Sequence, residues 1–147
     1  MVMKLPKAVL DRFRACGRAG GRARAARMSA GARRAVATTA AIRRWTSARF
    51  GAASFGALGL PGGEIVDAGL DALASGVSSV ESLVVSLAAP RLRREGVPLP
   101  DHVIPDAELR LFRLLEQSSG ELAHARYLAY LRQVASFADA CSAARIP

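Results

Sequence analysis

Positive charge is concentrated in the first third of this chain of 147 residues. Residues 1–50 contain thirteen Lys or Arg residues and one acid, Asp11, whereas residues 51–147 contain eight Arg and eleven acids. The first part has a net charge of +12 and the rest has −3. Because clustered cations bind phosphate backbones by releasing counterions, this separation predicts a polyanion-binding arm joined to a separately folded body.

A glycine-rich stretch without charge marks the best boundary between the two parts. Residues 51–63, GAASFGALGLPGG, contain five glycines and Pro61. This composition is typical of a hinge or loop. We therefore expect a basic, partly helical arm at residues 1–50, a hinge at 51–63 and a body at 64–147.

The body has the composition of an all-α fold. Apolar residues make up 51% of the chain but aromatic residues only 5%, so the core must consist mainly of Leu, Val and Ala on closely packed helices. No run of alternating polar and apolar residues indicates a strand. We predict four helices in the body. Because a body of this size has a thin core, a partner or self-association would help to cover its apolar faces.

Local signals place the first two helices of the body. Residues 64–75 repeat apolar side chains at helical spacing, and Gly76 is expected to end this helix in the left-handed conformation. Ser78 and Glu81 have the spacing of a capping box, which predicts the start of the second helix. Pro90 lies inside the apolar pattern of that helix, so we expect the helix to kink or end near this proline.

Prolines and glycines separate the last two helices. Residues 96–105 contain three prolines and are expected to form an extended surface connection. A helix then starts at Asp106 and is broken before Gly120. The longest helix is expected at residues 121–140, where apolar and aromatic side chains recur at helical spacing.

The basic arm is expected to contain two helices. The first covers residues 5–15 and is weakened by the three glycines that follow it. Ser29 is the expected N-cap of a second helix over residues 30–50. The apolar stripe on this second helix is narrow and weakly core-forming, and it consists of Val36, Ala40, Ala41 and Trp45.

The arginines of this arm are the candidate phosphate contacts, and Trp45 beside them could stack on a base. The candidate nucleic-acid-binding residues are Arg22, Arg24, Arg27, Arg33, Arg34, Arg43, Arg44 and Trp45. Three alternatives remain open. The arm could be a flexible solvated tail or a cleaved organelle-targeting segment, and Trp45 could pack the arm onto the body.

A second polar group lies early in the last expected helix. His124, Arg126 and Tyr127 are a possible acid–base or anion-binding site, since His124 and Tyr127 would lie on adjacent turns of one face. The alternative is that Tyr127 and Tyr130 pack into the core while His124 and Arg126 reach solvent or hydrogen-bond to the proline-rich loop.

Signatures of an enzyme are missing from the sequence. No histidine or carboxylate pair has the spacing of a metal or hydrolytic site, and no nucleophile motif such as G-x-S-x-G is present. Cys16 and Cys141 lack metal-ligand or redox spacing and are expected to be free thiols. We therefore expect no catalytic residues, no metal and no cofactor.

One segment resembles a known sequence element. Residues 17–45, GRAGGRARAARMSAGARRAVATTAAIRRW, are similar to a short basic Gly-Gly/Arg-Ala…Arg-Trp element that recurs in bacterial and phage-type proteins, and this element carries no firm activity with it. The body is not assigned to a family. The layout of a basic end joined to a partner-binding end resembles that of small bacterial antitoxins and regulators.

Together these features predict a non-enzymatic module that binds DNA or RNA through its arm. The body would bind a protein partner or form a homo-oligomer, and we expect a cytoplasmic protein without a membrane contact. The alternative is a structural subunit of a larger protein or ribonucleoprotein assembly, whose basic arm docks on RNA or on a partner protein.

Overall fold

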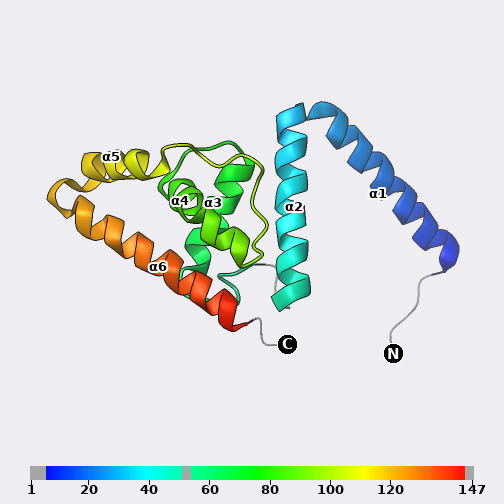
Figure 1. The fold of residues 1–147 in the computed structure, drawn as a ribbon. Helices are drawn as coiled ribbons and strands as arrows, with labels where there is room; N and C mark the ends of the chain where they lie inside the picture. Colours follow the sequence, from blue (N-terminus) through cyan, green and yellow to red (C-terminus); the bar gives the residue numbers. More distant parts are fainter. Residues whose placement is uncertain (1–5, 51–53, 145–147) are drawn as a thin grey trace. The chain divides into compact units, whose positions relative to one another are not determined.

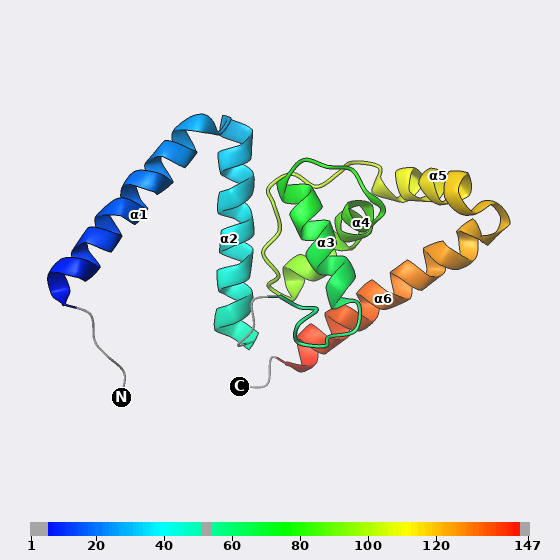
Figure 2. The same cartoon turned by 180° about the vertical axis from the view of Figure 1, so that it is seen from behind.

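The computed structural model describes residues 6–50 and 54–144, so the remaining residues of the expected arm, hinge and body lie outside the described part. Within that part the chain is helical and has no strand, which confirms the expected all-α class. Figures 1 and 2 show the helices from opposite sides. They are α1 (Lys7–Arg27), α2 (Ala30–Phe50), α3 (Gly63–Ala74), α4 (Val80–Arg94), α5 (Ala107–Ser119), a 3₁₀ turn (Gly120–Leu122) and α6 (Ala123–Ala143).

The chain divides into two compact units, Met1–Arg34 and Ala35–Pro147. This division lies inside α2, whereas composition pointed to residues 51–63. Two side chains explain the difference, because Ile42 is 7% exposed and Thr46 is 1% exposed. The C-terminal part of α2 therefore belongs structurally to the second unit. Whether residues 64–147 fold independently stays a prediction.

The face of α2 that packs is not the apolar stripe expected from the sequence. Val36 is exposed, as are Ala40 and Ala41, whereas Ile42 and Thr46 are buried. Thr46 tolerates burial because its hydroxyl donates to the carbonyl oxygen of Ile42 at 2.9 Å, which satisfies its polar atom within the helix. Thr46 is therefore buried on a face of α2 that the sequence pattern predicted to be exposed to solvent.

The glycine-rich stretch is anchored to the core in the residues described. Phe55 is fully buried, and its ring lies edge-on to the rings of Phe137 at 4.9 Å and Trp45 at 6.2 Å between centroids. The carboxylate of Asp67 accepts hydrogen bonds from the backbone N–H groups of Phe55 at 3.1 Å and Gly56 at 2.8 Å. Residues 55–59 are turns, and one aromatic side chain and one carboxylate attach this segment to the core. Whether residues 51–63 act as a hinge stays a prediction.

Helix α4 is central to the second unit and packs against α3, α5 and α6. Gly69 of α3 permits the closest approach, since a Cβ at this position would meet Val85 and would lie 2.5 Å from the carbonyl oxygen of Glu81. The fully buried leucines of this core are Leu70, Leu83, Leu92, Leu111 and Leu115.

The start of α4 differs by one residue from the expected position. Ser79, rather than Ser78, is the N-cap, and its hydroxyl oxygen accepts from the N–H of Ser82 at 3.2 Å. The hydroxyl oxygen of Ser82 accepts in turn from the N–H of Ser79 at 2.7 Å. A serine therefore completes the capping box in place of Glu81.

Pro90 does not end α4, which continues to Arg94. The proline ring is exposed, so it clashes with no neighbouring element. Burial of Leu92 in the next turn offsets the hydrogen bond that the proline cannot donate. Gly96, at φ 78°, then reverses the chain in the left-handed region.

Other helix ends follow their local signals more closely. The hydroxyl of Ser29 accepts from the N–H of Ala32 at 3.1 Å, and α2 has the expected bounds. Gly76 has φ 70°, which confirms the left-handed end after α3. Helix α1 instead continues through all its glycines to Arg27, and α6 begins after the 3₁₀ turn, at Ala123.

Candidate functional site

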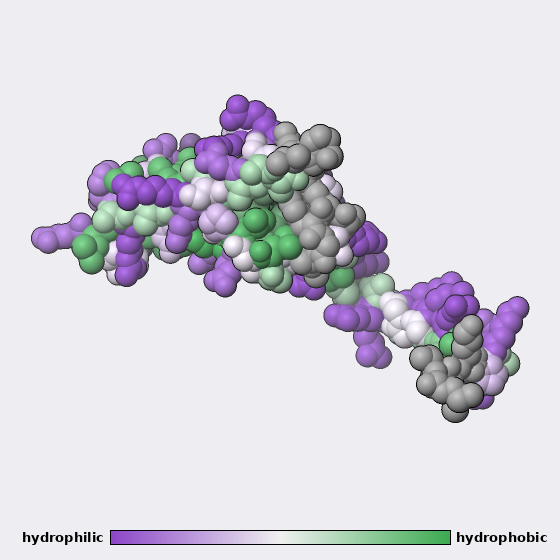
Figure 3. All heavy atoms as spheres, turned by 90° about the horizontal axis from the view of Figure 1, so that it is seen from below, coloured by the Kyte–Doolittle hydropathy of each residue, from purple (hydrophilic) through white to green (hydrophobic). Residues whose placement is uncertain are grey.

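Helix α1 is strongly basic and contributes no side chain to a core. None of its side chains is buried, and Figure 3 shows mostly hydrophilic side chains on the visible side of this helix. Three internal glycines each cost about 1 kcal/mol relative to alanine, and arginines four residues apart repel one another by about 0.2–0.5 kcal/mol. A helix of 21 residues that buries no side chain is marginal in water. We therefore expect a bound partner to stabilise α1.

The candidate phosphate contacts are divided between the two units. Arg22, Arg24 and Arg27 lie in the last two turns of α1, where cations also favour the helix dipole. Arg33 and Arg34 lie near the start of α2, at the end of the first unit, whereas Arg43 and Arg44 belong to the second unit. All seven side chains are exposed, and no ion pair joins any of them to a described residue.

Trp45 is half-buried rather than free on the surface. Its ring packs edge-on against Phe55 of the core. The same turn of α2 exposes Arg43 and Arg44. The structure thus places the tryptophan at the junction between the basic surface of α2 and the core of the second unit.

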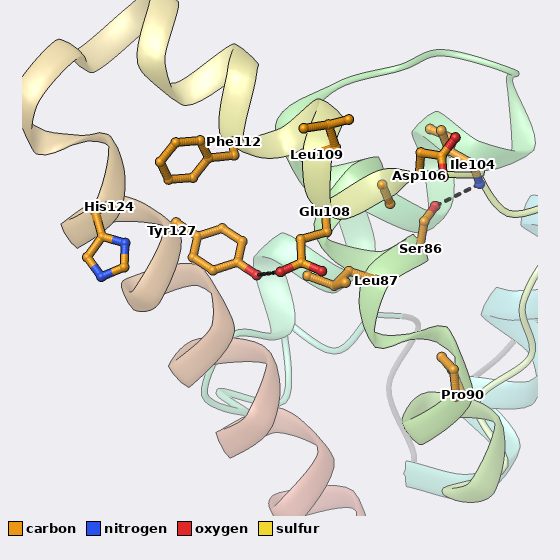
Figure 4. A pocket seen from close by; sticks show the side chains of 11 residues that line it. Ser86, Leu87, Pro90, Ile104, Asp106, Glu108, Leu109, Phe112, His124 and Tyr127 are labelled. Atoms are coloured by element: carbon orange, nitrogen blue, oxygen red, sulfur yellow. Dashed lines mark hydrogen bonds between the residues drawn. The ribbon is translucent and has the colours of Figure 1, made fainter.

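The second polar group lies on a groove of about 760 Å³ formed by α4, α5, α6 and the proline-rich connection (Figure 4). Ser86 of α4 holds this connection, because its hydroxyl oxygen accepts from the N–H of Ile104 at 3.1 Å and its hydroxyl donates to the carbonyl of Ser82 at 2.7 Å. The apolar walls are formed by Leu87, Pro90, Ile104, Leu109 and Phe112.

A tyrosine and a glutamate meet at the centre of this groove. The hydroxyl of Tyr127 donates to a carboxylate oxygen of Glu108 at 2.9 Å, and the ring of Phe112 lies edge-on to that of Tyr127 at 6.1 Å (Figure 4). Burial of the ring, and then the hydrogen bond and negative charge of Glu108, raise the pKa of Tyr127 above its ordinary value of 10.0. The hydroxyl therefore stays a hydrogen-bond donor at neutral pH.

Only two of the three residues of the expected polar site line the groove. His124 and Tyr127 do so from adjacent turns of α6, whereas Arg126 is exposed and does not line it. Within the described residues no hydrogen bond or ion pair joins His124 to another side chain. The groove is suited to hold apolar side chains beside a cation, because Asp106 and Glu108 are its acids and no Lys or Arg lines it.

Sequence reasoning missed the half of the groove that α5 provides. Leu111 and Leu115 of this helix are buried, but Leu109 is 52% exposed and Phe112 is half-buried. Both lie outside the buried stripe of α5. An apolar pair beside that stripe was therefore the sequence signal that could have indicated a second apolar surface on this helix. The residues of α4 could not be assigned to the groove because only tertiary packing brings them there.

The described residues contain no candidate metal site, no disulfide and no helix that could span a membrane. No group of three or more His, Cys, Asp or Glu residues in this part could hold a metal ion. Cys16 is exposed and Cys141 is buried, and neither forms a disulfide within the described residues. No helix in this part has the length and apolar character needed to cross a membrane.

Comparisons with known proteins identify no relative of this chain. Neither the family models nor the curated proteins nor the solved structures contain a match to the chain.

Proposed function

We propose that the chain is a non-enzymatic nucleic-acid-binding and protein-interaction module, of the regulator or antitoxin-like kind, and that it acts in the cytoplasm. A basic helical arm contacts phosphates, and a small four-helix body binds a protein partner or a second copy. The proposed phosphate contacts are Arg22, Arg24, Arg27, Arg33, Arg34, Arg43 and Arg44, with Trp45 as a stacking residue where its ring is exposed.

The observation that carries this proposal is the exposure of all seven arginines on helices with almost no acids. Asp11 is the only acid in residues 1–50, and it already pairs with Arg14. A polyanion would relieve the repulsion among the remaining cations and gain entropy from the counterions it releases. The same contacts would stabilise α1, which obtains no stability from a core.

A salt titration of the full chain tests the proposal. Binding to a short labelled DNA duplex and to a single-stranded RNA is measured by fluorescence anisotropy between about 50 and 200 mM salt. Replacing Arg22, Arg24 and Arg27 together with Gln should weaken binding. It should also lower the slope of log K against log salt by about 2.7 on the duplex, or about 2.1 on the single strand.

The matched control removes the same charge from the body. Arg93, Arg113 and Arg132 are exposed residues of α4, α5 and α6, and replacing all three with Gln should leave the salt slope unchanged. Equal losses in both triple variants would show that net charge alone drives binding, and would contradict the assigned contacts. Binding to RNA without binding to the duplex would favour the structural-subunit alternative.

A further inference from the structure

Two apolar surfaces stand out among the described residues because they are exposed to solvent. The first is on α1, where Val9, Leu10 and Phe13 are exposed and Phe13 is 66% exposed. Gly17 continues this side of the helix one turn after Phe13, and no atom lies within 4 Å of the position of its missing Cβ. This half of α1 therefore presents a continuous apolar face with room for close approach.

The second uncovered surface is the groove around Tyr127. A smaller groove of about 240 Å³ between α4 and α6 shares Leu87 with it, so the apolar surface extends along α4 toward Leu131 and Ala135. Leu109 forms part of its exposed rim. An elongated apolar groove between helices is the shape that accepts a further amphipathic helix.

The charges of the two surfaces are complementary. Lys7, Arg12 and Arg14 flank the apolar face of α1, whereas Asp106 and Glu108 line the groove around Tyr127, which no Lys or Arg lines. Arg91 lines only the smaller groove, where it pairs with Asp139 at 2.6 Å. The partner that the groove selects is thus a helix with large apolar side chains one turn apart and cations beside them.

We propose that the groove binds helix α1 of a second copy of this chain, so that two copies exchange their α1 helices in a reciprocal dimer. A two-fold dimer satisfies both surfaces of both copies at once, because each chain supplies one helix and one groove. This inference rests on the proposed function, and it identifies the protein partner of the body as a second copy of the chain. Arg18 and Arg22 lie on the other side of α1 and stay available to phosphates.

Sedimentation velocity of the full chain without nucleic acid tests the exchange. The wild type should show a concentration-dependent species of twice the 15.5 kDa chain mass. Phe13→Asp and Leu109→Asp should each raise the dimer dissociation constant at least about tenfold, because each places a charge in the contact. Both side chains are more than half exposed, so we expect the variants to remain folded. An unchanged circular dichroism spectrum will verify this.

Mixing the two variants distinguishes exchange from other dimers. The Leu109→Asp chain keeps an intact α1 and the Phe13→Asp chain keeps an intact groove, so an equimolar mixture should associate where neither variant does alone. This association should be weaker than that of the wild type because only one of two contacts is restored. Leu122→Asp is the control, since Leu122 is 62% exposed near the same end of the unit but does not line the groove.

Several results would overturn the exchange. They are a wild type that stays monomeric at high concentration, a dimer that Phe13→Asp leaves intact, an equal loss in Leu122→Asp, and a mixture that behaves like its components. The duplex titration is independent of these results. Leu109→Asp leaves every proposed phosphate contact in place, so loss of the dimer with duplex binding retained separates this inference from nucleic-acid binding.

Discussion

The burial of Phe55 leads to a sharp prediction, because composition alone assigns this residue to a hinge. Phe55→Ala removes a fully buried ring that contacts Phe137 and Trp45. A buried Phe→Ala change costs about 3–5 kcal/mol, and the lost edge-to-face contacts keep this site from the lower end of that range. We expect a loss of about 4 kcal/mol in the free energy of unfolding.

Urea denaturation followed by circular dichroism measures this loss. With a slope of about 2 kcal/mol per molar urea, the midpoint should fall by about 2 M. Trp45 is the only tryptophan in the chain and lies against Phe55, so its fluorescence reports the same contact locally. Its emission should shift to the red in the folded Phe55→Ala protein as water reaches the indole ring.

Phe13→Ala, measured at a protein concentration low enough to keep the chain monomeric, is the matched control, since it makes the same substitution on an exposed side chain of α1. Its effect should stay within about 0.5 kcal/mol. Phe55→Leu keeps part of the buried volume and should lose about 1–2 kcal/mol, which keeps the fold measurable if the alanine variant unfolds. A Phe55→Ala protein as stable as Phe13→Ala would contradict the anchoring of this segment by the Phe55 ring.

Three further changes probe particular contacts. Ser79→Ala should destabilise the protein by about 1 kcal/mol and Ser78→Ala by less than about 0.5 kcal/mol in thermal melts, and the reverse order would restore the cap expected from the sequence. Gly69→Ala should cost more than about 2 kcal/mol in urea although alanine favours helices, because its Cβ meets Val85 and the backbone of Glu81. Glu108→Gln should lower the pKa of Tyr127, measured by ultraviolet absorbance against Tyr127→Phe as a blank. The fold raises this pKa, so the contribution of the contact to stability should be complete below about pH 10 and should disappear as the pH rises through the raised pKa.

Much of the helical structure follows from signals within one turn of the chain. The hydroxyl of Ser29 caps α2, and Gly76 adopts the left-handed conformation after α3, as their positions in the sequence predict. The exposure of the arginines also follows from sequence, because so many cations with a single acid have no partner with which to be buried. These features depend on neighbouring residues and on charge, both of which are written in the chain itself.

Tertiary packing decided the features that local patterns concealed. Thr46 and Phe55 entered the core although a polar residue and a glycine-rich segment both suggest solvent. Pro90 stayed inside α4 because burial of the following turn outweighed one lost hydrogen bond. The groove at Tyr127 is formed where three helices meet, and its lining residues are far apart in the sequence. A local pattern cannot show which of these side chains come together, because their burial depends on tertiary packing. The sequence by itself determined the all-helical class and the basic surface, and the long-range contacts decided where the core ends and where the groove forms.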